Sequence, residues 1–412
     1  MELPSSLVNR VIAVSTLGIF VEAYDYFVMG VIAVGVWPKV FLNSSNLSLM
    51  ISLFAYLVAY LSKPLGGIVM GHFADVKGRK TSMFWSVFMS AVSVGLISAV
   101  PASLGAFGLL IITILRFIQG FGSGGNHGSS LTLNYELVIK GKKTRHKMWL
   151  LQLGPVLGLV ISVIVVSAFQ GMGENPAFLN YGWRLAILVG AGLLAFRSFL
   201  RTKLIESPDF LALKEKGYVT DLPVKSLLLS QWREVLLAFL SVVYYRTTLN
   251  FLVYPFLFKF FAQEGRDATA VLALGFAFSV LSIFLGALMT FKLSWIKVAI
   301  ASVASTSLTV PLVLLDDPLT LLPLFVTSSL GWGAMGYMVG EFDPRHRSTG
   351  TGLVFNTSDV VPSVLSVVLL PFLKATYVGK PLVTVVIVEE AVILASLFSL
   401  FLIRRKKSTT EV

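Results

Sequence analysis

Long apolar runs recur along this 412-residue chain and constrain its fold more than any other feature. A helix that crosses a bilayer needs about 20 mostly apolar residues. The chain is 56% hydrophobic and only 13% charged, which leaves too little polar surface for a soluble globule. We therefore expect an all-α integral membrane protein with twelve transmembrane helices. These predicted spans cover residues 10–37, 47–72, 80–100, 104–138, 147–171, 182–202, 232–259, 267–290, 294–315, 319–341, 348–373 and 380–403.

The residue types that most catalytic and metal sites require are scarce. There is no cysteine, which excludes disulfides, thiolate metal sites and thiol nucleophiles. The four histidines are scattered, and the chain has neither an HExxH zinc motif nor a nucleotide-binding P-loop. We expect a protein that is not an enzyme and that holds no metal and no cofactor.

The net charge of +12 is explained by where the basic residues lie relative to the membrane. Most of them fall on one side of the predicted topology, which by the positive-inside rule is the cytoplasm. Both termini then lie in the cytoplasm, and the number of spans must be even. We expect the lipid bilayer of the plasma membrane as the surroundings and no nucleic acid as a partner. The basic segments on that side include Arg10 and residues 77–80, 140–147, 197–233, 292–297, 345–347 and 404–407.

The longest polar stretch divides the predicted spans into two sets of six. Residues 1–202 are expected to form an N-terminal six-helix bundle, 203–230 a cytoplasmic linker, and 231–412 a C-terminal bundle with a short basic tail. Within the linker, Ser207 followed by Pro208 and Asp209 predicts the start of a short amphipathic helix. Two six-helix halves are suited to alternating access, with a substrate site between them near mid-bilayer. We expect a monomer.

Acidic residues lie inside the first predicted span. Glu22 and Asp25 fall near its middle, and their spacing places them on one helical face with Tyr26. Charged side chains at this depth are functional candidates, since they are costly to insert. We expect Asp25, with Glu22, to couple transport to protons, although a permanently paired structural acid is the alternative. Only nine residues precede the span, so we expect a retained helix and not a cleaved leader.

The fourth span carries a polar stripe and a stripe of small residues. Arg116 and Gln119 lie on the polar stripe, and Arg116 could hold a substrate carboxylate or neutralise Asp25. A structural ion pair is the alternative for Arg116. Gly120, Gly124 and Gly128 allow a neighbouring helix to approach closely.

Polar and aromatic residues also occur at mid-depth in the second half. Tyr245, Arg246 and Asn250 in the seventh span and Asn356 and Asp359 in the eleventh are candidate substrate contacts. A structural pair between Arg246 and Asp359 is an equal alternative. Three further charged residues in spans carry less weight, because Lys63 can snorkel and Glu389 and Glu390 can lie nearer the outer interface.

The loop between the second and third spans resembles the signature loop of the major facilitator superfamily. It contains Gly71, Asp75, Gly78, Arg79 and Lys80. The residue after the acid departs from that pattern, because valine stands where a basic residue is usual. The acid can cap a neighbouring helix and the arginine can pair with acids, which would close the cytoplasmic face. We expect a cytoplasmic gate here.

Further segments resemble the metabolite:proton symporter family within that superfamily. They lie in order at residues 22–27, 63–67, 116–125, 182–184, 201–210 and 341–356. The last includes Glu341 and Arg345, which the resemblance assigns to the cytoplasmic gate. The resemblance implies the major facilitator fold and proton-coupled symport of a small organic acid or zwitterionic metabolite. A sugar carrier or a proton-linked exporting antiporter of the same superfamily is the alternative.

Overall fold

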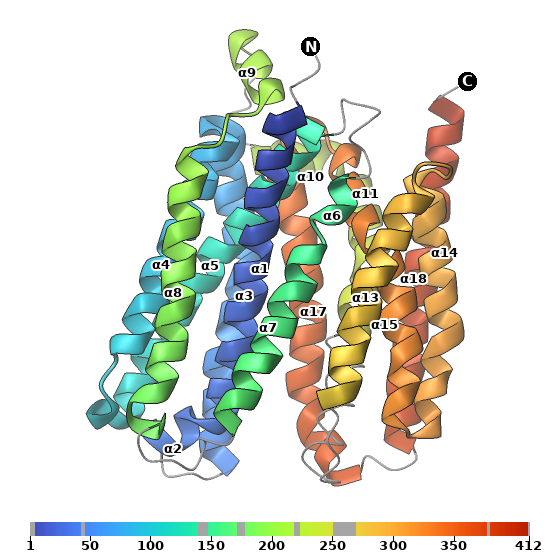
Figure 1. The fold of residues 1–412 in the computed structure, drawn as a ribbon. Coiled ribbons are helices and arrows are strands. Elements are labelled where there is room, and N and C mark those ends of the chain that lie inside the picture. Colours follow the sequence, from blue (N-terminus) through green and yellow to red (C-terminus); the bar gives the residue numbers. More distant parts are fainter. Residues whose placement is uncertain are drawn as a thin grey trace.

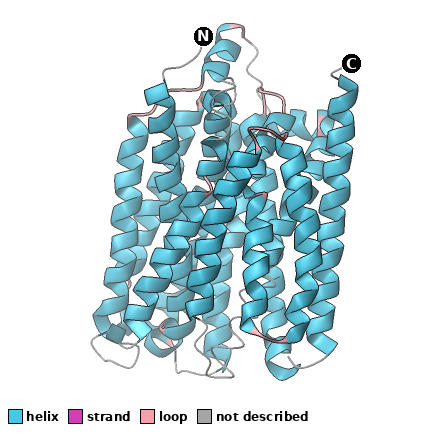
Figure 2. Cartoon of the chain, turned by 45° about the vertical axis from the view of Figure 1, so that its right-hand side comes forward, coloured by secondary structure: helices cyan, strands magenta, loops and turns pink. Residues whose placement is uncertain are grey.

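The computed structural model describes residues 5–42, 46–138, 147–170, 178–217, 223–249, 269–376 and 380–410. In these residues all regular secondary structure is helical, as Figure 2 shows. This confirms the all-α prediction.

Each predicted span of the first half has a helical counterpart (Figure 1). The fifth span begins with the short helix α6 (Lys147–Leu150), and a further short helix, α2 (Trp37–Phe41), follows the first span. The six long helices are α1 (Ser5–Gly35), α3 (Asn46–Lys77), α4 (Arg79–Ala99), α5 (Gly105–Val138), α7 (Leu153–Gln170) and α8 (Trp183–Thr202).

The second half repeats this arrangement with more irregular helices. The tenth span is broken into α15 (Leu321–Leu330), η6 (Trp332–Ala334), α16 (Met335–Met338) and η7 (Val339–Glu341). Asn250 and the remainder of the seventh predicted span lie outside the described residues. The other long helices are α11 (Trp232–Thr247), α13 (Thr269–Met289), α14 (Trp295–Thr309), which continues as η4 (Val310–Leu315), α17 (Arg347–Thr376) and α18 (Lys380–Thr410).

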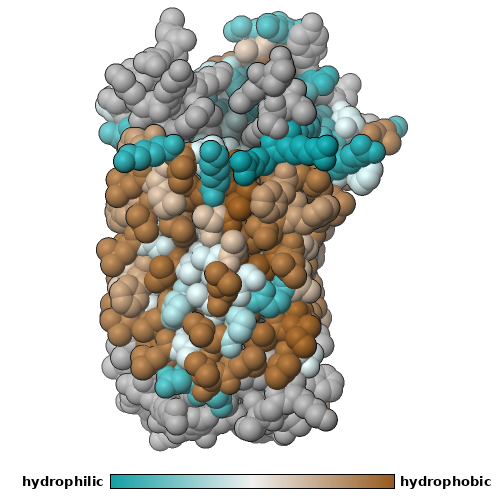
Figure 3. Space-filling view, turned by 90° about the vertical axis from the view of Figure 1, so that its right-hand side faces the viewer, coloured by the Kyte–Doolittle hydropathy of each residue, from teal (hydrophilic) through white to brown (hydrophobic). Residues whose placement is uncertain are grey.

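The outer surface is suited to lipid. Within the described residues, eight helices are long and apolar enough to cross a membrane, and α10 (Pro223–Ser230) meets the same criterion only together with α11, from which it is bent by 86°. Figure 3 shows an apolar belt, interrupted by a paler and more hydrophilic patch, below a band of hydrophilic residues at the end of the molecule where Figure 1 marks both termini. We call that end the terminus side.

Glycines on α5 bring the central helices together. A Cβ added at Gly120 would collide with the carbonyl oxygen of Ala59, and one at Gly124 with that of Lys63, both on α3. One at Gly128 would lie 2.7 Å from the Cα of Gly352 on α17. The predicted stripe of small residues therefore allows α5 to contact α3 and α17 backbone to backbone. This close packing fixes the positions of the polar side chains between them.

Each half also has an apolar core. Trp37 and Trp183 are fully buried in that of the first half, and Val303 and Phe325 in that of the second. Trp149 on α6 reaches from the first half into the second, where its indole N–H donates to the carbonyl of Leu330 at 3.4 Å.

The chain leaves α8 through a short helix at the terminus side. Helix α9 (Pro208–Glu215) begins after Ser207, whose hydroxyl accepts the backbone N–H of Phe210 at 3.2 Å. This is the N-cap that the sequence predicts. Phe210 is buried and holds α9 against the bundle.

Candidate functional site

Four charged side chains form a chain of alternating sign between the two halves. Lys63 on α3 lies 3.4 Å from Glu22 on α1 and 3.3 Å from Asp359 on α17. The other oxygen of Asp359 is 2.8 Å from the Nε of Arg246 on α11. A carboxylate of the second half is thus held by one cation from each half. Arg246 and Asp359 are paired, as one of the two sequence interpretations expects.

Lys63 is enclosed rather than directed to the membrane surface. Its side chain is only 6% exposed, and its ammonium lies 4.1 Å from the ring centre of Tyr26 and 5.1 Å from that of Tyr60. The prediction that Lys63 snorkels is wrong, because the aromatic rings and two carboxylates surround it. The sequence signal for this enclosed position was that Lys63 lies near the middle of a long span.

Asp25 has a neutral partner. The amide of Gln119 donates to Asp25 in a short hydrogen bond, and the amide oxygen of Gln119 accepts from Arg116 at 2.7 Å. Arg116 also donates to the carbonyl of Tyr56 at 3.2 Å and is fully buried. Gln119 therefore stands between the arginine and the acid that the sequence analysis brings together. Tyr26, the third residue of the predicted face, lies between Lys63 and Arg116.

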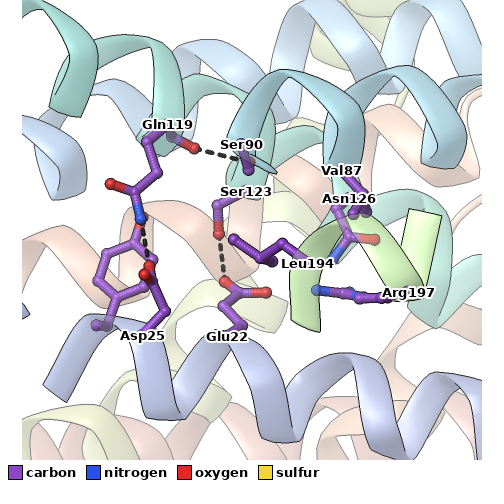
Figure 4. A pocket seen from close by; sticks show the side chains of 10 residues that line it. Glu22, Asp25, Val87, Ser90, Gln119, Ser123, Asn126, Leu194 and Arg197 are labelled. Atoms are coloured by element: carbon purple, nitrogen blue, oxygen red, sulfur yellow. Dashed lines mark hydrogen bonds between the residues drawn. The ribbon is translucent and has the colours of Figure 1, made fainter. Parts of the chain in front are cut away.

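A small pocket lies beside these acids, within the first half (Figure 4). Ser123 donates to one oxygen of Glu22, while the other oxygen has no hydrogen-bond partner in the described part of the chain and faces Asn126 and Arg197 across the pocket. The space open to water is about 10 Å³, roughly enough for one water molecule. A metabolite therefore cannot enter in this conformation. The lining residues are Glu22, Asp25, Tyr26, Val87, Ser90, Gln119, Ser123, Asn126, Leu194 and Arg197.

Two candidates of the second half have structural contacts. Tyr245 is buried with its ring 4.1 Å from that of Trp332, and it lies beside Arg246. Asn356 donates to the carbonyl of Gly124 at 2.9 Å, and so joins α17 to α5. Their side chains border the charged chain, and Asn356 ties the halves together.

The predicted gate acid caps a helix of the other half. Asp75, at the end of α3, accepts the backbone N–H groups of Ser348 and Thr349 at 3.2 and 2.9 Å and the Thr349 hydroxyl at 2.7 Å. These groups belong to the first turn of α17. The prediction of a capping acid is confirmed for Asp75. Gly71 makes the approach possible, since a Cβ there would lie 2.8 Å from the Cα of Thr349.

An ion network extends this contact. Arg79 lies 3.4 Å from both Asp75 and Glu136 and donates to the carbonyl of Pro344 at 2.9 Å. Glu136 also lies 2.9 Å from Arg347 of the second half. The predicted pairing of Arg79 with acids is confirmed. Glu136 and Arg347 were not predicted as gate residues, although Arg347 lies in a basic segment and an acid near the end of the fourth span is a visible signal.

Gly78 and Lys80 act through the backbone. Gly78 has φ of 114°, a value that favours glycine, and a side chain there would collide with Glu206. The Glu206 carboxylate accepts the N–H of Arg79 at 2.9 Å and that of Lys80 at 3.2 Å. The sharp turn thus exposes the first N–H groups of α4 to an acid that caps them.

The remaining predicted gate residues lie at the end of the tenth span. Glu341 ends η7 and is partly exposed. Arg345 donates twice to Asp343, at 2.9 Å each, and this pairing holds the pKa of the Asp343 carboxyl below its usual range. Arg345 therefore pairs within its own loop, and the contact with the first half is made by Arg347.

Glu389 on α18 faces the protein interior. It is fully buried, and its carboxylate contacts the hydroxyls of Thr247 and Thr248. Helix α11 covers this face of α18, and the depth of Glu389 nearer the outer interface stays a prediction. Within the described part of the chain, no three His, Asp or Glu side chains are grouped as metal ligands.

Comparisons agree with this architecture. The chain is 31% identical over 200 residues to the shikimate transporter of Escherichia coli strain K12, covering 48% of this chain and 45% of the relative. It is 26% identical over 403 residues to a putative metabolite transport protein of Haemophilus influenzae, covering 90% and 88%. The chain thus matches nearly all of one relative and less than half of the other.

Among solved structures, the proton:xylose symporter XylE of the major facilitator superfamily aligns with a TM-score of 0.78 at 16% identity, covering 96% of each chain. At this identity the likeness shows the fold, which is the twelve-helix fold expected from the sequence. The profile of the family "Sugar (and other) transporter" matches residues 11–221, just over half of the chain. The chain therefore belongs to the sugar (and other) transporter family and is a multi-pass membrane transporter of the major facilitator superfamily.

Proposed function

We propose that this transporter moves a small organic acid or zwitterionic metabolite together with a proton. The observation that carries the proposal is the neutral partner of Asp25, beside a chain of charges that joins the halves. A buried carboxylate is stable when it is protonated or when a cation compensates it. Asp25 bonds to an amide, so a proton is the natural means of neutralising it.

Glu22 and Asp25 then have different roles. Glu22 has a direct ionic partner in Lys63, a hydroxyl donor in Ser123, and the guanidinium of Arg197 across the pocket. These groups stabilise its ionised form. We assign the coupling proton to Asp25 and a charge-retaining role to Glu22.

The substrate class follows from the residues around Asp359. Its carboxylate is held by Lys63 and Arg246, and a substrate carboxylate can compete for the same two cations. One of these cations belongs to each half, so their shared anion influences whether the halves stay together. The shikimate transporter among the relatives is named for a carboxylic acid, which supports this class.

Alternating access would use the terminus-side contact as a gate. The Asp75 cap and the Arg79, Glu136 and Arg347 network join the halves there, and opening must break both. From the distribution of basic residues we assign this side to the cytoplasm and the protein to the plasma membrane. The conformation described is then closed toward the cytoplasm.

The test is uptake into proteoliposomes of labelled shikimate, citrate, glycine betaine and xylose, with and without an inward proton gradient. Wild type is compared with Asp25→Asn and with Asp317→Asn, which removes the same charge from an exposed loop. We expect gradient-driven accumulation of an acid by wild type and the control. Asp25→Asn should exchange that acid across the membrane without accumulating it.

Other results would revise the proposal. Accumulation by Asp25→Asn would place the proton site elsewhere. Efflux of the acid in exchange for protons would favour an antiporter. Uptake of xylose alone would favour a sugar carrier, the second candidate, which the family profile and the fold of the xylose symporter support.

A further inference from the structure

A second buried carboxylate lies in the C-terminal half, away from the charged chain. Glu389 on α18 is 0% exposed. One oxygen lies 3.1 Å from the Thr247 hydroxyl and 2.6 Å from the Thr248 hydroxyl, both at the end of α11. The other oxygen has no hydrogen-bond partner among the residues that the structure describes. A side chain this enclosed must have its charge compensated or be neutral.

No cation compensates it among the described side chains. The neighbouring acid Glu390 bonds to Ser307 on α14 and adds a second negative charge. Arg246 on α11 is engaged by Asp359 on α17. None of the charged residues on the elements packed against α18 forms an ion pair with Glu389. The remaining ones with described side chains are Arg233, Glu234, Lys297 and Arg347.

Counting hydrogens also favours a neutral acid. The Thr247 and Thr248 hydroxyls each lie within hydrogen-bond distance of the backbone carbonyl of Tyr244, at 2.9 and 2.8 Å, as well as of Glu389. Two hydroxyls supply two hydrogens for these four contacts. Back-bonding to a carbonyl one turn earlier is a common use of a threonine hydrogen in a helix. A hydrogen on Glu389 supplies a further bond, to the Thr248 hydroxyl.

We propose that Glu389 is a second proton-carrying site, whose proton moves in the transport cycle. Its two hydroxyl partners directly follow Arg246 in the chain, and Arg246 holds Asp359. When a substrate carboxylate displaces Asp359 from Arg246, this turn of α11 moves. The Thr247 and Thr248 hydroxyls, which hydrogen-bond to Glu389, move with it. Substrate binding and the proton on Glu389 are thereby linked. This inference rests on the proposed symport.

A proton fits the site better than a sodium ion. The gathered oxygens are the Glu389 carboxyl and two hydroxyls, and the hydroxyls already serve the Tyr244 carbonyl. Hard cations prefer a shell of about six oxygens, usually including several carboxylate or carbonyl groups directed at the ion.

The first test is independent of any substrate. Infrared spectra of the purified full chain in lipid, recorded in H₂O and D₂O at pH 7, report protonated carboxyl groups by a carbonyl band that shifts with deuteration. We expect Glu389→Gln to lose one component of this band, Asp25→Asn another, and Glu390→Gln neither. A band unchanged by Glu389→Gln would overturn the proposal.

The second test counts protons with shikimate as the probe, in proteoliposomes that contain a pH-sensitive dye. Glu389→Gln should take up one proton fewer per shikimate than wild type, while Glu390→Gln should match wild type. An unchanged proton count would make Glu389 a static acid, and sodium-dependent uptake would replace the proton by an ion. If wild type transports no acid, the symport proposal fails, while the infrared result still decides whether Glu389 holds a proton.

Discussion

The terminus-side contact and the charged chain beside Asp25 both join the halves through buried charges, but the carboxylates in the two regions have different partners. At the terminus side, Asp75 is held by backbone N–H groups and Glu136 by two arginines. In the centre, Asp25 has an amide partner, and one oxygen of Glu22 has no hydrogen-bond partner within the described segments. In the first region paired groups must separate together when the halves part, whereas in the second region a carboxylate can change its proton or its partner. A transporter needs both, in separate places.

The largest loss of uptake is expected from removing Lys63, the cation that Glu22 and Asp359 share. Lys63→Met leaves Glu22 and Asp359 without their bridge, and breaking a buried pair typically costs about 3–5 kcal/mol. Uptake of the accumulated acid should fall roughly 100-fold or more. The exposed Lys292→Gln serves as the control. Uptake by Lys63→Met within a few-fold of wild type would show that the charged chain is dispensable.

A second experiment tests the close contact of α5 with α3, which positions the polar side chains between the helices. Gly120→Ala forces a methyl group against the carbonyl of Ala59, and overpacking of this kind costs roughly 1–3 kcal/mol. The thermal unfolding temperature in detergent should drop. Gly192→Ala is the matched control, because a Cβ there meets nothing within 4 Å and alanine is the better helix former. Equal stability of the two variants would contradict the backbone contact between α3 and α5.

A smaller effect is expected at the gate. Asp75→Asn keeps an acceptor but removes the negative charge at the N-terminus of α17, a loss of about 0.3–1 kcal/mol, or up to roughly a fivefold shift in the open-to-closed ratio. Because the chain has no cysteine, spin labels at Lys203→Cys and Lys292→Cys report the terminus-side distance without background. Asp75→Asn should increase the longer-distance population. An unchanged distribution would remove Asp75 from the gate.

The smallest effect is on stability and concerns the ion pair of Arg345 and Asp343 beside the gate. Arg345 lowers the pKa of Asp343, so this pair stabilises the fold above the unfolded pKa of Asp343 and loses that contribution as the pH falls through the folded value. Because the pair is largely solvated, Arg345→Gln should cost only a few tenths of a kcal/mol at pH 7. The difference in unfolding temperature from wild type should vanish at strongly acidic pH. A difference that grows on acidification would contradict the assignment.

Features that depend on local pattern could be predicted from the sequence. Apolar runs predict the helices, the glycine stripe on α5 predicts a close contact, and Ser207 predicts the start of α9. Asp75 could be assigned as a cap because it lies in a recognisable loop. Each of these properties is encoded within a few residues or turns of one helix.

Several partners that come from distant segments could not be predicted, although the pair of Arg246 and Asp359 was one of two expectations. Lys63 and Asp359 are 296 positions apart in the sequence, and Glu389 and Thr248 are 141 positions apart. In a membrane helix, apolar residues cover both lipid-facing and buried faces, so periodicity does not tell which way a polar residue points. For this reason the sequence does not show that Lys63 points inward, to two carboxylates.

The Asp75 cap also bears on which substitutions this protein can accept. Two of the three hydrogen-bond donors to Asp75 belong to the main chain, and the Ser348 hydroxyl makes no hydrogen bond to any residue that the structure describes. Position 348 can therefore accept other small residues that keep an N–H group, while position 75 must supply an acceptor. Sequence drift in the second half can leave the gate intact, provided that the chain still begins a helix there.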